Sequence, residues 1–356
     1  MALSKINNDS FDDTAVHGRR NLIINGAQIV SQRNGTTDTT ISSTGNVYTL
    51  DRWGAFVSQT GKISVQQSTD VPSGYSFKNS AKITSLSAYS IGTGDYFGYN
   101  TALEGQDVAH LGFGASGAKS ITISFWVKSS LTGTFGIAVR EQPSSPGRSF
   151  PTNYTISSAN TWEHKTLTVP GDTSGTWSTD NTAGFNLWFD LGTGSSFQGT
   201  GDQWNSANDA TTSGTVSVVG TNAATWYVTG VQVEVGDKAT PFEHRSFGEE
   251  LARCQRYFQT LRGQDRYPGD AGHPEVVFGS ANLLQTPMRS QPSLSVSGAL
   301  SFDEYYVSGR TQSSSNIGRN SGNTQCVIPS FNNFSSMTRG NSGAIYNADI
   351  DIDAEL

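Results

Sequence analysis

The sequence predicts a mainly β protein: an antiparallel jelly-roll sandwich, a short connecting α-helix and a smaller C-terminal β domain. Three observations lead to this fold class. The chain of 356 residues holds 39 glycines and only 15% charged residues, which favours short strands and long polar loops over helices. Segments that alternate apolar and polar residues fill much of the region before residue 245, and a single helical pattern follows them.

Residues 1–20 are polar and mixed in charge, so we expect an arm that orders against a partner. The sandwich is expected over residues 21–245, where turn residues separate the predicted strands. Three strands show clean alternation, with residues 121–127, 135–140 and 185–190 each placing every second, apolar side chain on one face. The nine predicted strands are 21–30, 61–68, 80–86, 119–128, 133–141, 163–170, 184–192, 214–220 and 225–236.

The helical pattern covers residues 246–262. Ser246 and Glu249 form a capping box at its start, and Gly263 is a typical residue for its end. Apolar residues recur at intervals of four and three, which predicts a coiled-coil seam between copies of the chain; they are Phe247, Leu251, Cys254, Phe258 and Leu261. Packing of this stripe on the adjacent domain is an equally good alternative, because two heptads are short for a coiled coil. Residues 263–356 again alternate short strands and polar loops, and predict a β-rich tip domain.

Large aromatic and polar residues occupy the positions of the predicted strands that face away from the core. A sugar ring stacks on an aromatic face while charged or amide groups bind its hydroxyls, so these residues are candidates for glycan binding. They are Trp126, Lys128, Arg140, Asn186, Trp188 and Asp190. The alternative is that a long loop or a neighbouring subunit covers this face and makes it part of a core or an interface.

Two glycine-rich segments, 91–100 and 191–204, are predicted as loops rich in exposed aromatic residues. Aromatic side chains on such loops suit recognition of a glycan or a partner surface, although packing within the loops would explain them equally well. The aromatic residues in question are Tyr96, Phe97, Tyr99, Phe197 and Trp204.

Several classes of function are disfavoured. A net charge of −7 argues against nucleic acid, whose phosphates require clustered Lys and Arg. No apolar run approaches the length of a membrane span, and residues 1–13 lack the apolar core of a signal peptide. The five histidines show no metal-ligand spacing, no hydrolase motif occurs, and Cys254 and Cys326 are expected to be free thiols. We therefore expect no enzymatic activity and no cofactor, although sequence alone leaves a glycosidase carboxylate pair open.

Several segments, taken in order, resemble the sandwich domain of tailed-bacteriophage fibre proteins, which is itself similar to the jelly-roll carbohydrate-binding modules of glycoside hydrolases. They are NLIINGAQIVSQRNGT, YTLDRW, ITISFWVKSSLTGTFGIAVR, TWEHKTLTVPG and VTGVQVEVGDKATPFEHRSFGEELARCQRYF. The later TPMRSQPS and DIDAEL resemble the tip domain that ends many such fibres. The similarity covers residues 21–262 well and 263–356 more loosely.

The resemblance implies a homotrimeric virion fibre, made in the host cytoplasm without a signal peptide, that attaches to the host cell through surface polysaccharide. Residues 1–20 would dock it to other virion proteins. The carbohydrate-binding modules often carry a structural calcium, but no ligand cluster for one can be assigned in this sequence. The alternative is a structural decoration or connector protein of the virion whose aromatic faces bind neighbouring proteins rather than sugars.

Overall fold

The computed structural model describes residues 20–141, 147–261, 267–273, 276–279, 282–297, 300–304, 311–314, 316–332, 342–346 and 349–356. The predicted docking arm therefore lies outside the described residues, apart from Arg20. The chain divides into two compact units, Met1–Phe247 and Gly248–Leu356, and each is described by itself below.

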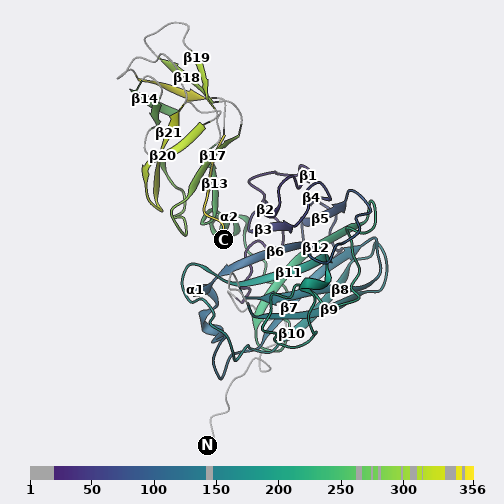
Figure 1. The fold of residues 1–356 in the computed structure, drawn as a ribbon. Helices are drawn as coiled ribbons and strands as arrows, with labels where there is room; N and C mark the ends of the chain where they lie inside the picture. Colours follow the sequence, from purple (N-terminus) through teal and green to yellow (C-terminus); the bar gives the residue numbers. More distant parts are fainter. Residues whose placement is uncertain are drawn as a thin grey trace, which may run out of the picture. The chain divides into compact units, whose positions relative to one another are not determined.

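Two six-stranded antiparallel sheets form the first unit, as the jelly-roll prediction requires (Figure 1). Sheet 1 has the order β1 (Thr39–Thr40), β4 (Ile63–Ser68), β5 (Ser80–Ser85), β12 (Thr225–Val235), β7 (Ile121–Ser129) and β10 (Glu163–Val169). Sheet 2 has the order β2 (Gly45–Leu50), β3 (Trp53–Val57), β6 (Tyr96–Glu104), β11 (Ala183–Thr193), β8 (Gly133–Arg140) and β9 (Ser149–Ile156). Short helical turns follow two strands of sheet 2: α1 (Gly105–Val108) and η2 (Ala109–Leu111) after β6, and η3 (Ser195–Phe197) after β11.

The core lies between the two sheets and is built by the alternation that the sequence predicts. Ile121, Ile123, Phe125 and Val127 of β7 are fully buried, and so are the inward residues Phe185, Leu187 and Phe189 of β11. Phe125 meets Phe189 across the interface, with their ring centroids 5.1 Å apart. This contact joins sheet 1 to sheet 2, because each strand presents every second side chain to the same face.

Seven of the nine predicted strands are present, but segments 21–30 and 214–220 are not strands. Segment 21–30 does not form a strand because Asn25 and Gln28 adopt left-handed backbone conformations, each with a φ of 56°. The side chain of Asn25 then binds the backbone of Val30 and of Asp51, which replaces the ladder of a sheet with a local turn. Strands β1, β2, β3, β6 and β9 lie outside the predicted segments.

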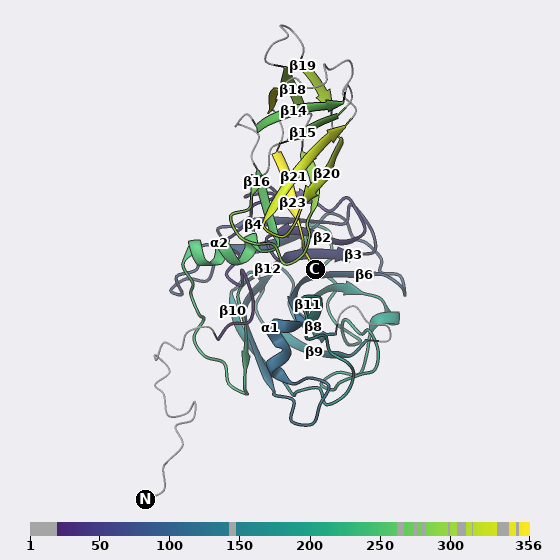
Figure 2. The same ribbon diagram turned by 90° about the vertical axis from the view of Figure 1, so that its left-hand side faces the viewer.

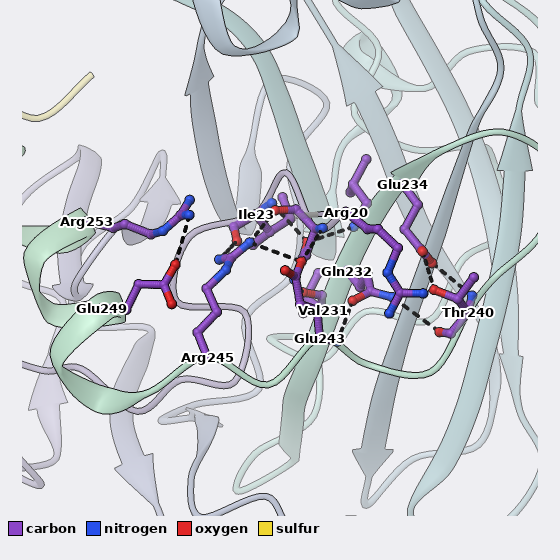
Figure 3. A network of polar contacts seen from close by, with 12 residues as sticks. Arg20, Ile23, Val231, Gln232, Glu234, Thr240, Glu243, Arg245, Glu249 and Arg253 are labelled. Atoms are coloured by element: carbon purple, nitrogen blue, oxygen red, sulfur yellow. Dashed lines mark hydrogen bonds and ion pairs between the residues drawn. The ribbon is translucent and has the colours of Figure 1, made fainter. Parts of the chain in front are cut away.

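A polar network fastens this turn to β12 and to the segment that follows it (Figure 3). Arg245 donates hydrogen bonds to the backbone oxygens of Asn21 and, at 2.9 Å, of Ile23. Glu243 accepts the Asn21 N–H at 2.7 Å, while its own N–H donates to Gln232 at 2.8 Å. Residues more than 200 positions apart are thereby held together.

The second unit is also β-rich, in agreement with the predicted C-terminal domain (Figure 2). Its first element is helix α2 (Phe247–Gln255), all of which except Phe247 belongs to this unit. A three-stranded sheet has the order β13 (Phe258–Leu261), β23 (Asp349–Asp353) and β17 (Ser293–Ser297). The larger sheet has the order β16 (Asn282–Leu283), β21 (Cys326–Asn332), β15 (Val276–Gly279), β14 (Tyr267–His273), β22 (Ser342–Tyr346), β18 (Leu300–Glu304) and β19 (Thr311–Ser314), with β20 (Asn316–Gly322) paired to β21.

The prediction of one continuous helix over 246–262 is wrong in its second half. Helix α2 begins after Ser246, as the capping box predicts, but it ends at Gln255. Phe258 and Leu261 lie instead in strand β13, paired with Asp353 and Ile350 of β23. The predicted seam therefore does not exist as one helical stripe.

Burial within the single chain gives the physical reason. Cys254 and Phe258 are 0% and 1% exposed, and Tyr257, which lies between them, is 1% exposed. The Tyr257 N–H donates to the Cys254 carbonyl at 2.9 Å, and the Tyr257 carbonyl accepts the Ala354 N–H at 2.8 Å. The chain gains more from pairing with β23 than from extending the helix, so the apolar positions are buried within the chain. At the other end of the stripe, Phe247 is 58% exposed and Leu251 is half-buried.

Candidate functional site

The six predicted glycan-binding residues all face away from the core, but they lie on two different sheets. Trp126 and Lys128 are on β7 of sheet 1, whereas Arg140 on β8 and Trp188 on β11 belong to sheet 2, with Asn186 and Asp190. The outer faces of the two sheets point in opposite directions, because their inner faces share one core. The prediction of one site containing both tryptophans is therefore wrong.

The sheet 2 residues are buried, which fits the alternative reading of a face covered by a loop. Trp188 is 1% exposed and lies directly over Gly98, where an added Cβ would approach the indole to 2.1 Å. Phe56 packs edge-on against it at 5.6 Å, and the Arg140 guanidinium lies 4.8 Å from the ring centroid. Ala210, from the loop after β11, belongs to the same apolar cluster. Trp188 is thus a packing residue with no face available to a sugar.

The polar candidates of sheet 2 are likewise engaged inside the protein. Asn186 donates to Asn100 at 2.9 Å, and Asp190 accepts hydrogen bonds from the Gly192 N–H and the Thr193 hydroxyl at 2.9 and 2.7 Å. Burial raises the pKa of Asp190 in spite of these hydrogen bonds. Burial also lowers the pKa of Arg140 to about 10, against the opposing attraction of Asp209. Asn186 thus joins β11 to β6, while Asp190 and Arg140 order the loop over sheet 2 through hydrogen bonds with Thr215 and Asn208.

The predicted loop aromatics have separate structural roles. Tyr96, Phe97 and Tyr99 belong to strand β6 rather than to a loop, and Phe97 and Tyr99 are fully buried core residues. Tyr96 lies on the outer side of sheet 2, in edge contact with Phe197 at 5.5 Å. Trp204 is half-buried, packs against Phe150, Phe113 and Trp177, and donates its indole N–H to the Pro170 carbonyl at 2.7 Å. The prediction of exposed glycan-binding loops in these segments is therefore wrong.

An aromatic surface does exist, on the outer face of sheet 1, and it contains Trp126. We call it the aromatic platform; its rings are Tyr75, Trp126, Trp162, His164 and Tyr227. Trp126 and His164 are directly opposite each other on β7 and β10, with ring centroids 5.1 Å apart. Tyr75, which is 51% exposed, also contacts Trp126, with their ring centroids 4.3 Å apart.

The second half of the platform surrounds Lys128, two residues along β7 from Trp126 and therefore on the same face. Its ammonium lies 4.4 Å from the centroid of Tyr227 and 5.5 Å from that of Trp162. Lys128 also forms an ion pair with Asp70, whose other carboxylate oxygen accepts the Trp162 indole N–H at 3.0 Å. Two aromatic rings, a cation and a carboxylate are thus held in fixed relation.

The electrostatics of the platform follow from these contacts. Partial burial acts to raise the pKa of Asp70, but the hydrogen bonds from Lys128 and Trp162 outweigh it and hold the pKa below its ordinary value. Partial loss of solvent contact beside Trp126, and secondarily the charge of Lys165, lower the pKa of His164, so that its ring is neutral at pH 7. Burial also raises the pKa of Tyr227, which keeps its hydroxyl as a hydrogen-bond donor.

Sequence reasoning found Trp126 and Lys128 but missed the other members of the platform. Tyr227 had a usable signal, because it lies between the buried Trp226 and Val228 on a strand that was predicted. His164 could have been placed only through the pairing of β10 with β7, which brings it opposite Trp126. Asp70 and Tyr75 come from the connection between β4 and β5 and carry no periodic signal.

The described part of the chain shows neither a cluster of metal ligands nor a helix that could cross a membrane. No group of three or more His, Cys, Asp or Glu residues there is arranged to hold a metal ion. Among the same residues, no helix has both the length and the hydropathy that crossing a membrane requires.

Comparison with known proteins gave no match to a protein-family model and none to a curated relative. Solved structures similar to the chain include the enzymatically active domain of tailspike protein 4 from bacteriophage CBA120, with 13% identity over 60% of this chain and 21% of that one, and a TM-score of 0.32. A family 4 carbohydrate-binding module matches with 19% identity over 58% of this chain and 99% of its own, at a TM-score of 0.30. A putative sugar-binding protein from Bacteroides thetaiotaomicron matches with 13% identity over 61% of this chain and 100% of its own, at a TM-score of 0.32. The chain spans only about a fifth of the tailspike, and at these TM-scores the similarities carry no argument for function.

Proposed function

We propose that this protein binds polysaccharide through the aromatic platform of sheet 1. The observation that carries the proposal is the set of side-by-side rings on an outward sheet face, with Tyr75 half exposed and His164 exposed beside Trp126. Exposed aromatic surface costs solubility and is usually retained for contact with a ligand or partner. Flat rings beside fixed polar groups suit a chain of pyranose units in particular.

The chemistry of recognition follows from the two halves of the platform. The apolar face of one sugar would stack on Trp126 and Tyr75, while an adjacent sugar would lie near Trp162 and Tyr227. Asp70, whose side chain is 44% exposed, would accept hydroxyl protons, while the buried Lys128 would hold Asp70 in place. Because the ion pair already fixes both side chains, little conformational entropy is lost when the sugar binds.

The biological setting that we propose is attachment of a bacteriophage virion to the polysaccharide of its host. Support comes from the ordered segments of sequence that resemble phage fibre proteins, together with the platform. We propose a binding role without catalysis. The proposal of a homotrimer rests on the resemblance alone, because the prediction of a helical seam is wrong. Light scattering that gives three times the chain mass would support a homotrimer, and a monomer at micromolar concentration would contradict it.

Affinity electrophoresis of the full chain through gels that contain host capsule or lipopolysaccharide tests the proposal. Trp126→Ala should weaken binding about tenfold, since stacking on one ring contributes on the order of 1 kcal/mol beyond the area it buries. Thr166→Ala is the matched control, because Thr166 is exposed on the adjacent β10 and carries no ring.

Three other outcomes would redirect the proposal. If the gel retards Trp126→Ala as strongly as Thr166→Ala, the aromatic platform is not part of the binding site. Failure of the wild-type chain to bind host polysaccharide or host cells would favour the alternative of a structural virion protein. Release of reducing ends during incubation would show that the protein cleaves the glycan.

A further inference from the structure

A concave site lies on the first unit, away from the aromatic platform, in the loop that follows β11. It is a polar pocket of about 720 Å³ formed within residues 195–213. This volume lies within the ~300–1,000 Å³ range of small-molecule sites. Its walls carry amide, hydroxyl and carboxylate groups, among them those of Gln198, Asn205, Asp209, Thr212 and Ser213.

The walls of the pocket are held in place by hydrogen bonds to strand β9. The backbones of Asn205 and Ser149 exchange hydrogen bonds of 2.8 and 3.2 Å. The Ser149 hydroxyl, in turn, accepts the Asp209 N–H at 3.1 Å, and Thr212 donates to Asn153 at 2.9 Å. Across the loop, the Gly199 N–H donates to the Thr211 carbonyl at 2.9 Å. A pocket built this way is largely formed before a ligand arrives, which lowers the entropic cost of binding.

Asp209 is the charged group of this pocket. The residue is only 7% exposed, and its carboxylate receives no hydrogen bond from the described residues. It lies so close to Gly199 that a Cβ there would be 2.0 Å from Oδ2. The Asp209 oxygens are not among the buried side-chain atoms that lack a partner, so they reach the solvent that fills the pocket. Their acceptor positions are therefore available to a ligand that lies in the pocket.

The neighbouring charges decide what kind of ligand fits. Arg140, buried behind the loop, attracts Asp209 electrostatically but gives its own hydrogen bond to Asn208. The positive charge of Arg140 disfavours a cationic ligand, while the carboxylate disfavours an anionic one. The described lining contains one carboxylate and no group of three or more His, Cys, Asp or Glu side chains, which does not favour a metal ion as the ligand. Neutral hydroxyl donors remain, and a carboxylate accepts two of them well when they lie on adjacent carbons.

We propose that this pocket is a second saccharide-binding site, specific for a neutral sugar unit that donates two hydroxyl protons to Asp209. The site is independent of the aromatic platform, because it lies on the loop that covers sheet 2 rather than on the face of sheet 1. The platform would hold an extended chain by stacking, whereas the pocket holds a single unit by hydrogen bonds.

Saturation-transfer difference NMR on the full chain tests the pocket, with glucose, galactose, mannose, N-acetylglucosamine, lactose and cellobiose as separate probes. We expect at least one neutral sugar to bind with millimolar affinity. Asp209→Asn should weaken it about tenfold or more, since a hydrogen bond to a charged group is stronger than one to a neutral group. Glucuronic acid and glucosamine, which have charged groups, should bind more weakly than their neutral counterparts.

Two further variants separate a binding role from a structural one. Ser213→Trp fills the pocket from an exposed position and should abolish binding without altering the melting temperature. Trp126→Ala should leave binding of the small sugar unchanged even where it weakens polysaccharide binding, so the two proposals can fail separately. Absence of binding by all six neutral probes, or unchanged binding in both Asp209→Asn and Ser213→Trp, would overturn the inference.

Discussion

Replacement of Trp188 by alanine separates a packing role from a binding role most clearly. The side chain is 1% exposed, with Gly98 beneath it, Phe56 at its edge and Arg140 near its face. Burial of roughly 200 Å² of aromatic surface at about 25 cal/mol per Å² corresponds to at most about 5 kcal/mol. The indole N–H has no acceptor among the described residues, so its removal breaks no hydrogen bond there. Large-to-small core substitutions of this kind cost about 3–5 kcal/mol, and we expect about 4 kcal/mol here.

Urea denaturation followed by far-ultraviolet circular dichroism measures this loss. A destabilisation of about 4 kcal/mol should lower the melting temperature by roughly 10 °C in a unit of this size. Trp126→Ala is the matched comparison; because Trp126 is only half-buried, it should cost less than about 1 kcal/mol. A Trp188→Ala protein as stable as the wild type, but defective in polysaccharide binding, would refute this account of sheet 2 and restore the sequence-based prediction.

Three further predictions concern other parts of the chain. Arg245→Met should destabilise the first unit by about 2 kcal/mol in chemical denaturation, because it removes charged hydrogen bonds to two backbone carbonyls. The control Arg253→Met, on the exposed side of α2, should cost at most about 0.5 kcal/mol. Cys254 should resist thiol reagents and form no intermolecular disulfide in the native protein, because it is fully buried, while the half-exposed Cys326 should react first in a quantitative labelling assay. The pKa of Asp70 is lowered in the folded state, so the contribution of Asp70 to stability is complete above the ordinary pKa of 3.8 and is lost as the pH falls further. In Asp70→Asn, the free energy of unfolding should therefore depend less on pH in this acidic range.

Sequence reasoning predicted the direction of side chains well and their neighbours poorly. The alternation in β7 and β11 correctly placed Phe125 and Phe189 in the core and Trp126 and Trp188 outside it. Alternation is a local property, so it cannot say to which of the two sheets a strand belongs. The order of strands depends on pairings between residues far apart in the chain, and these place the two tryptophans on opposite faces.

The errors at β6 and α2 have a similar origin. The glycines before Tyr96 predict a loop, yet Phe97 and Tyr99 alternate with Gly98 and Asn100 as a strand would, and the structure follows the alternation. In residues 246–262 the heptad spacing fits a helix throughout, but pairing of β13 with β23 outweighs it after Gln255. A partner strand almost one hundred residues later carries no signal in the local sequence.

The central claim, that polysaccharide binds on the aromatic platform, is tested most directly by ¹⁹F NMR of the full chain labelled with 5-fluorotryptophan. Each of the seven tryptophans gives its own signal, which can be assigned by single Trp→Phe variants. On titration with host polysaccharide, the signals of Trp126 and Trp162 should shift or broaden together, while those of the buried Trp53, Trp188 and Trp226 should not move. Binding that leaves the Trp126 and Trp162 signals unchanged would contradict the account.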